Sequence, residues 1–156
     1  MSDAIEARLK ELGYTLPVAA TPVANYVPYM LTGNLLHISG QLPMESGKVA
    51  VTGHLGRDVD VETAQRAAEL CAVNILAQVK AALNGDLSKV RRVVKLNGFV
   101  ASAPEFTEQH LVINGASNLV ANALGEAGKH ARAAVGVASL PFNAAVEIDA
   151  IVEVDV

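Results

Sequence analysis

Two charged residues near the C-terminus have the chemical character of a small-ligand site. The stretch HARAAVGVASLPFNAAVEIDAIVEVDV, residues 130–156, places Arg132 ahead of a run of small residues and Glu147 in the segment that follows. An arginine can bind a carboxylate through two parallel hydrogen bonds. A surface ion pair for Arg132 and a solvated acid for Glu147 are the more common uses of such residues. On this pattern alone, both uses stay open.

The two segments around these charges alternate as β-strands do. Val135 and Val137 are expected to form the core face of the first strand, while its other face holds Arg132 and small residues such as Ala134. Small residues let a ligand or a neighbouring backbone approach closely, so this face suits another subunit. If the two strands form a simple hairpin, Glu147 lies too far from Arg132 for a direct ion pair. Both could still flank one ligand or meet groups of another protomer.

Composition and charge exclude several classes of protein. The 156-residue chain has a net charge of −4 and only 4% aromatic residues, so no nucleic-acid partner is expected. No apolar run approaches the roughly 20 residues that span a bilayer, and the N-terminus does not resemble a signal peptide. We therefore expect a cytoplasmic protein without a membrane partner. The single cysteine, Cys71, agrees with a reducing compartment and falls in an apolar helical stripe, which favours core packing.

Several kinds of catalytic site are also excluded. The four histidines share no metal-ligand spacing, so no metal is expected. Neither a Gly-rich phosphate loop nor a nucleophile elbow is present.

Hydrophobic periodicity predicts one α+β domain over residues 1–156, with helices on one face of a mixed sheet. Residues 1–24 form an extension made of a short helix and a Pro- and Ala-rich connector. Asp60 is the expected N-cap of the longest helix, and Gly85 follows its end. The expected helices cover residues 3–13, 61–83 and 108–124, and the expected strands cover 27–31, 35–41, 91–102, 133–139 and 146–156.

Four motifs in order resemble those of the YjgF/RidA (reactive intermediate deaminase A, endoribonuclease L-PSP-like) family. NYVPYMLTGNLLHISGQLP contains a Gly-Asn hairpin leading into Ser-Gly-Gln-Leu-Pro. ARAAVGVASLPFNAAVEIDAIVEV contains Ala-Arg before a Val-rich strand, then Leu-Pro, then a final strand beginning Val-Glu-Ile-Asp-Ala. The similarity runs from about residue 25 to the C-terminus.

The resemblance implies a chorismate-mutase-like α+β fold assembled as a homotrimer, with clefts between neighbouring subunits. It also implies hydrolysis of reactive enamines and imines, such as 2-aminoacrylate, to a keto acid and ammonia without a metal or organic cofactor. The implied partners are therefore a small imino or keto acid and further copies of the chain. In this family pattern, Arg132 matches the carboxylate-binding arginine and Glu147 matches the acid that orients water.

Further positions match the substrate-binding residues of the family. The tyrosine ahead of the hairpin corresponds to Tyr26, the Ser-Gly pair to Ser39 and Gly40, and an asparagine of the second long helix to Asn114. Ala134 stands at a substrate-binding position.

The chain departs from the family pattern directly after Arg132, where the best-known deaminases often carry Ser-Cys and this chain has Ala133 and Ala134. The N-terminal helix is a second departure. These differences indicate a divergent subgroup, so a different class of protein remains open. That alternative is a non-catalytic trimer that binds small carboxylates as a sensor or regulator. Both kinds of protein need Arg132, but only the enzyme needs Glu147.

Overall fold

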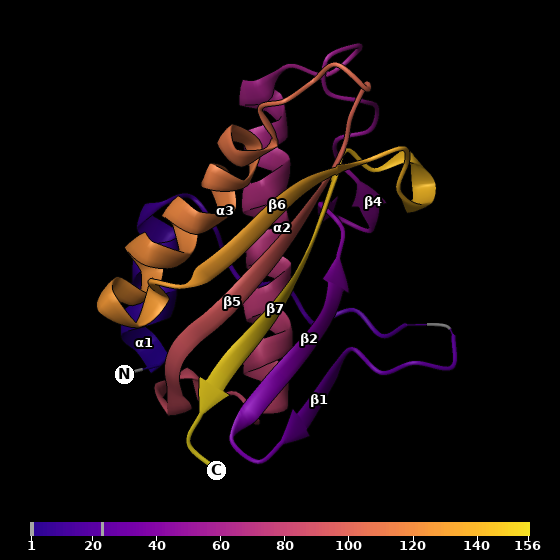
Figure 1. Cartoon of the computed structure of the whole chain (residues 1–156). Coiled ribbons are helices and arrows are strands. Elements are labelled where there is room, and N and C mark those ends of the chain that lie inside the picture. The colour runs from indigo at the N-terminus through magenta and orange to yellow at the C-terminus, as the bar shows by residue number, and fades with distance from the viewer. Residues whose placement is uncertain (1, 23) are drawn as a thin grey trace.

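The computed structural model describes residues 2–22 and 24–156, and residues 1 and 23 of the expected N-terminal extension lie outside this description. It shows an α+β fold in which helices cover one face of a five-stranded sheet (Figure 1). No helix in the described residues is long and apolar enough to cross a membrane.

The strand order in the sheet is β1-β2-β7-β5-β6, and only the β5–β6 pair is parallel. The hairpin between β1 and β2 turns at Gly33, which has a φ of +60°, as the sequence predicts. A separate two-stranded hairpin joins β3 to β4. The strands are β1 (Tyr29–Thr32), β2 (Leu35–Gln41), β3 (Met44–Glu45), β4 (Lys48–Val49), β5 (Val90–Ala101), β6 (Ala131–Val137) and β7 (Val146–Val154).

The longest helix, α2, begins where the sequence predicts, because the Asp60 side chain accepts a hydrogen bond from the Thr63 backbone N–H at 2.7 Å. Its predicted apolar stripe packs into the core, and Cys71 lies within it, fully buried. The helices are α1 (Ser2–Glu11), α2 (Val61–Ala82) and α3 (Gln109–Leu124), and short 3₁₀ segments are η1 (Leu87–Lys89), η2 (Gly125–Gly128) and η3 (Pro141–Asn143).

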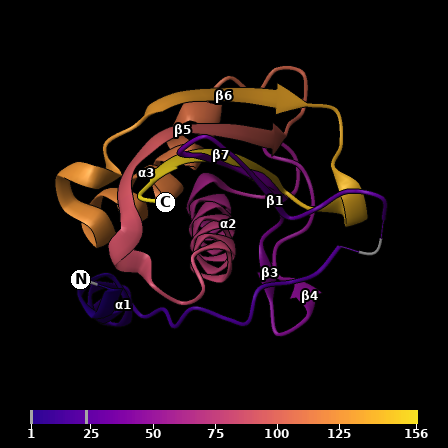
Figure 2. The same ribbon diagram turned by 90° about the horizontal axis from the view of Figure 1, so that it is seen from below.

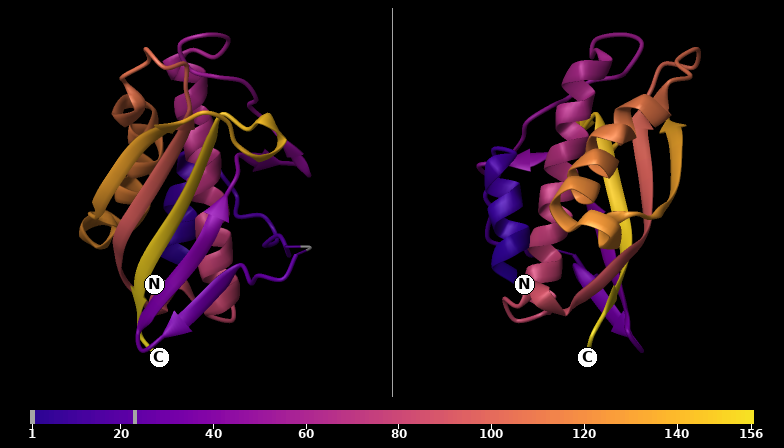
Figure 3. Two further views of the ribbon diagram at one scale, coloured as in Figure 1. Left: turned by 45° about the vertical axis from the view of Figure 1, so that its right-hand side comes forward. Right: turned by 90° about the vertical axis from the view of Figure 1, so that its left-hand side faces the viewer.

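The N-terminal extension forms a further layer outside the helices (Figure 3). Arg8 of α1 donates to the Ala123 carbonyl of α3 at 3.2 Å, and Glu6 pairs with Lys80 of α2 at 3.0 Å. After α1, Tyr14 donates to the Glu69 carboxylate at 2.7 Å. The extension therefore covers the side of α2 that faces away from the sheet, which explains why α2 is buried on nearly all sides.

The two closing strands do not form a hairpin with each other. After η3 the chain passes β5 and inserts β7 between β2 and β5, while β6 remains at the edge of the sheet. Leu96 of β5 pairs with Arg132, and Phe99 of β5 pairs with Glu147. The hairpin geometry considered from the sequence is therefore wrong, because the partner of both closing strands is β5.

The expected core face of β6 is also wrong. Val135 is 47% exposed, whereas Ala134, on the other face, packs against the core beneath α3. A β carbon at Gly98, which pairs with Ala134, would overlap Ile113 of α3. The small residues of β6 and β5 thus leave room for a close helix within the same chain, not for another subunit.

The opposite face of the sheet has no helix over it in the described part of the chain (Figure 2). Met30 of β1 is 58% exposed there, and Ile151 of β7 and Phe99 of β5 are half-buried on the same face. The registers connect Met30 to His37 and His37 to Ile151, so these side chains form one row across the sheet. This partly apolar face is continuous with the exposed side of β6.

The close crossing of α2 and α3 depends on Gly115. A β carbon there would overlap the backbone carbonyl of Gln65 in α2, and the Gln65 side chain donates to the Leu111 carbonyl at 2.8 Å nearby. A Gly-to-Ala change inside an exposed helix normally stabilises it by about 0.5–1 kcal/mol. Gly115→Ala should instead lower the free energy of unfolding by about 1–3 kcal/mol, because the two backbones must separate.

Urea unfolding measures this difference. Asn118→Ala is the matched control, because Asn118 is an exposed residue of the same helix and its substitution should leave stability unchanged or slightly higher. A Gly115→Ala protein more stable than wild type would contradict the inferred backbone contact.

Candidate functional site

The guanidinium of Arg132 is oriented by α3. Nη1 donates to Asn114 Oδ1 at 2.8 Å and to Ser117 Oγ at 3.2 Å, while Nη2 donates to the His110 carbonyl at 3.4 Å. These acceptors follow one face of the helix at i, i+4 and i+7. All are neutral, and Arg132 takes part in none of the ion pairs among the described residues. The positive charge of Arg132 is therefore held in place without being neutralised.

Glu147 lies on the uncovered face of the sheet, near the start of β7. It shares this face with Asp149, which accepts a hydrogen bond from Asn97 at 2.7 Å. Partial burial, together with the negative charge of Asp149, raises the pKa of Glu147 above its usual value of 4.5. No basic side chain among the described residues forms an ion pair with Glu147. Its carboxyl group can therefore bind and release a proton at a higher pH than an ordinary surface glutamate.

Gly40 lies directly against the Glu147 carboxylate. The β2–β7 register shifts between Ile38 and Gln41, so Ser39 and Gly40 form an irregular segment opposite β7. A β carbon at Gly40 would overlap the end of the Glu147 side chain. The glycine therefore leaves the space that this carboxylate occupies.

Ser39 forms two hydrogen bonds to the segment that carries Tyr26. Its Oγ donates to the Val27 carbonyl at 2.6 Å, and its backbone N–H donates to the Pro28 carbonyl at 2.9 Å. Tyr26 itself is 57% exposed. The Ser39 bonds tie this segment to the strand that carries Gly40, the neighbour of Glu147.

Arg132 and Glu147 do not meet within one chain. β5 lies between their strands, and their partners on β5, Leu96 and Phe99, point to opposite faces of the sheet. Strand spacing and rise place their Cα atoms roughly 14 Å apart. The structure thus brings Arg132 together with Asn114 at the sheet edge, and Glu147 with Gly40 on the uncovered face. A molecule the size of a small keto acid cannot contact both charged groups of one chain.

Some contacts of these groups were not anticipated from the sequence. Ser117 and the His110 carbonyl hold Arg132, and their spacing from Asn114 on a predicted helix is the signal that could have indicated them. Asp149 was expected only as part of a polar strand face.

Ala134 packs beneath α3, on the same face of β6 as Arg132. Cys71 is core packing as predicted: burial raises the pKa of its thiol, and the charge of Glu147 adds to this.

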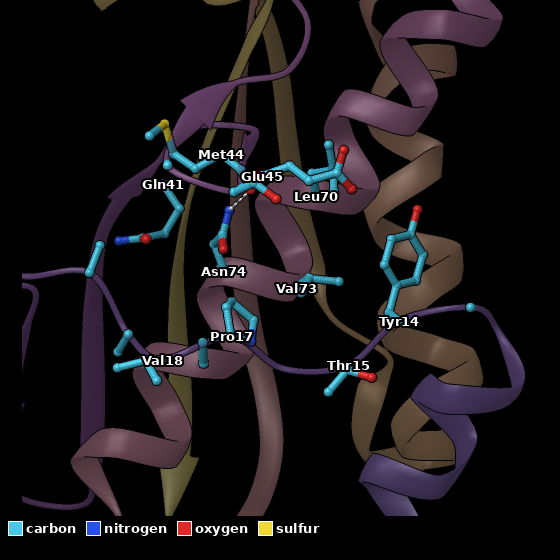
Figure 4. A pocket seen from close by; sticks show the side chains of 16 residues that line it. Tyr14, Thr15, Pro17, Val18, Gln41, Met44, Glu45, Leu70, Val73 and Asn74 are labelled. Atoms are coloured by element: carbon cyan, nitrogen blue, oxygen red, sulfur yellow. Dashed lines mark hydrogen bonds between the residues drawn. The ribbon is translucent and has the colours of Figure 1, made fainter.

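A separate cavity of about 350 Å³ lies between α2, the connector after α1 and the β3–β4 hairpin (Figure 4). Leu70 and Val73 of α2 form part of an apolar wall, and Asn74 donates to the Leu42 and Met44 carbonyls at 3.1 Å. Neither Arg132 nor Glu147 lines this cavity. In the described residues, no group of three or more His, Cys, Asp or Glu side chains is arranged to hold a metal ion.

Comparison with known proteins gives a consistent result. The sequence matches the family described as "YjgF/chorismate mutase-like, putative endoribonuclease" over residues 6–154. It is 53% identical to protein TCP17 of Trypanosoma cruzi over 155 residues, which cover 99% of this chain and 96% of that protein. It is 32% identical to the 2-iminobutanoate/2-iminopropanoate deaminase of Dermatophagoides farinae, over 89% of this chain and 93% of the relative.

Among solved structures, the crystal structure of Atu1372 from Agrobacterium tumefaciens, a protein described as of unknown function, is 80% identical. It superimposes with a TM-score of 0.95 over 99% of this chain and 94% of that one.

The raised pKa of Glu147 predicts a pH-dependent effect on stability. A carboxyl group whose pKa is higher in the folded than in the unfolded chain stabilises the fold while protonated, and this stabilisation is lost as the pH rises through the raised pKa. Glu147→Gln should therefore unfold at a higher temperature than wild type at neutral pH. The difference in unfolding temperature between the variant and wild type should vanish below about pH 4, where the glutamine and the protonated glutamate are both uncharged.

Thermal unfolding across this pH range provides the measurement. Glu153→Gln on the same strand is the control, because Glu153 pairs with Arg92 at 2.8 Å and should gain nothing from losing its charge. Equal unfolding temperatures for Glu147→Gln and wild type at neutral pH would show that Glu147 is not destabilised by its surroundings.

Proposed function

The chain belongs to the YjgF/chorismate mutase-like family, and we propose that it is a hydrolytic deaminase of reactive enamines and imines. Its substrates are 2-aminoacrylate-type compounds, which it converts to the keto acid and ammonia. The observation that carries this proposal is the Arg132 guanidinium, which neutral acceptors orient and which no acidic side chain among the described residues neutralises. A 2-imino acid carries a fixed carboxylate that such a group binds. The name of the Dermatophagoides farinae relative agrees with this substrate class.

The reaction requires little beyond a bound carboxylate and a positioned water molecule. The enamine first becomes the imine, and water then adds to the electrophilic C=N carbon. The addition leaves a hydroxyl and an amino group on that carbon. Transfer of the hydroxyl proton to nitrogen then forms the C=O bond as the C–N bond breaks, which releases ammonia and leaves the keto acid. Glu147 is suited to accept a proton from the water and return it to nitrogen, because its pKa is raised. We place the activity in the cytoplasm, in keeping with the free, buried Cys71.

We infer that each site is built from two chains of a homotrimer. One chain supplies Arg132 and Asn114 at its sheet edge, and the next supplies Glu147 and Gly40 with the segment around Tyr26. The opposite orientations of Arg132 and Glu147 support this arrangement, because one chain alone cannot present both to a small molecule. The uncovered, partly apolar sheet face supports it too, since exposed apolar surface of this kind marks subunit contacts.

A second candidate rests on Ala133 and Ala134, which follow Arg132 where the best-known deaminases often carry Ser-Cys. In this alternative the trimer binds small carboxylates at Arg132 without catalysing their hydrolysis. The two functions differ in whether Glu147 is needed.

An assay with 2-aminoacrylate tests the proposed activity. A dehydratase produces the compound from serine, and its loss is followed with and without the protein. Wild type should accelerate the loss over buffer. Glu147→Gln should lower the rate by about 10²–10⁴-fold, the usual contribution of a general acid–base. Arg132→Lys keeps the charge but loses the two parallel donors of the guanidinium, so it should raise KM more than it changes kcat.

The exposed Asn118→Ala variant should behave as wild type in this assay. If wild-type protein gives no acceleration, the deaminase function is excluded and the carboxylate-binding alternative remains.

Mixed trimers test the composite site. Arg132→Ala and Glu147→Gln are each expected to be nearly inactive. When the two variants are unfolded together and refolded at equal amounts, chance pairing in a cyclic trimer leaves about a quarter of the sites with both groups intact. The mixture should therefore recover about a quarter of wild-type activity.

Light scattering provides the control for this experiment, because the mixed particles should have three times the chain mass of 16.2 kDa. Particles of that mass without recovered activity would show that the two residues do not act across chains. A monomer mass would exclude the site between subunits.

A further inference from the structure

A chain of hydrogen bonds links His130 to the guanidinium of Arg132 through Ser117. His130 Nδ1 lies 2.6 Å from the Gly128 carbonyl, and its Nε2 lies 2.9 Å from Ser117 Oγ. Ser117 Oγ in turn accepts from Arg132 Nη1 at 3.2 Å. The three side chains are partly buried between α3 and the start of β6.

The direction of these bonds follows from the groups involved. A carbonyl oxygen only accepts, so the Gly128 carbonyl places the proton of neutral His130 on Nδ1. Nε2 is then an acceptor, and the Ser117 hydroxyl donates its proton to it. This leaves the oxygen lone pairs of Ser117 facing Arg132, which can only donate. His130 therefore fixes the hydroxyl of Ser117 in the orientation that accepts a bond from Arg132.

Hydrogen bonds within the same chain therefore occupy one side of the Arg132 guanidinium. Asn114 and Ser117 take both hydrogens of Nη1, and the His110 carbonyl takes one from Nη2. In the described part of the chain, Nε–H forms no hydrogen bond, and Nη2 forms a single one, to the His110 carbonyl. Because the other acceptors of α3 bond Nη1, we assign the His110 bond to the Nη2 hydrogen on the Nη1 side. Nε–H and the other Nη2 hydrogen are then parallel donors on one edge of the planar group, as a bidentate carboxylate requires.

We propose that His130 and Ser117 are positioning residues that lock Nη1 of Arg132, so that the substrate carboxylate binds through the Nε–Nη2 edge. This proposal rests on the proposed function for the identity of the substrate. Binding of a keto acid product to the same edge does not require turnover, so the positioning role can be measured separately.

The first test is steady-state kinetics with 2-aminoacrylate-type substrates. Ser117→Ala should raise KM about 10- to 150-fold, the effect of losing one hydrogen bond to a charged group, and should change kcat by less than about 3-fold. Ser117→Thr keeps the hydroxyl, so its KM should stay close to that of wild type. His130→Phe should raise KM in the same way as Ser117→Ala.

The double variant separates a linked pair from two independent structural effects. Because His130 acts only through Ser117, the combined substitution should raise KM no more than Ser117→Ala alone. Asn118→Ala, on the exposed side of α3, is the control and should leave KM unchanged. Additive effects of the two substitutions, or a threonine variant as impaired as the alanine variant, would overturn the proposal.

Calorimetric titration with pyruvate distinguishes failure of this proposal from failure of the proposed activity. Weaker pyruvate binding by both Ser117→Ala and Arg132→Ala supports the positioning role even if wild type has no deaminase activity. Pyruvate binding that needs Arg132 but is unchanged in Ser117→Ala overturns the positioning role and leaves the deaminase proposal intact. Binding that is unchanged in Arg132→Ala overturns the positioning role together with the carboxylate assignment.

Discussion

The position of β5 between β6 and β7 is the constraint on which the candidate site depends. Through the registers of β5, Arg132 is directed toward α3 and Glu147 toward the uncovered face of the sheet. In the proposed trimer, each charged group therefore belongs to a half-site, the part of a site that a single chain supplies. A trimer that places the edge of one sheet against the uncovered face of the next would join the two halves, and would bury the exposed apolar side chains of that face at the same time.

The two half-sites are prepared electrostatically in opposite ways. Neutral acceptors orient Arg132 and leave its charge available to an anion. Glu147 is partly buried next to a second acid, which favours its protonated form and suits the proposed proton transfer. Neither arrangement is the most stable use of a charged residue, since an ion pair with a nearby opposite charge would stabilise each group. Such unneutralised groups are typical of functional sites.

The N-terminal extension serves a different purpose from these half-sites. By covering the outer side of α2, it converts that helix from an amphipathic surface element into a nearly buried one, and it lines one side of the cavity beside Leu70 and Val73. The longest helix is thereby fixed between two layers. Helix α2 also packs against β7, because Cys71 of α2 contacts the Val146 carbonyl next to Glu147.

The sequence by itself determined the three helices and the five strands of the main sheet, the N-cap at Asp60, the hairpin at Gly33 and the burial of Cys71, because periodicity and capping are local properties of the chain. It also determined that Arg132 and Ala134 share a face. Only the tertiary structure decided which face that is, since alternation groups side chains without saying which group meets the helix. In β6, the close approach of α3 leaves room for small side chains such as Ala134 beneath the helix, so Val135 faces the other side of the sheet. The insertion of β7 beside β5 likewise came from long-range pairing, which no local pattern records, and this pairing separated Arg132 from Glu147.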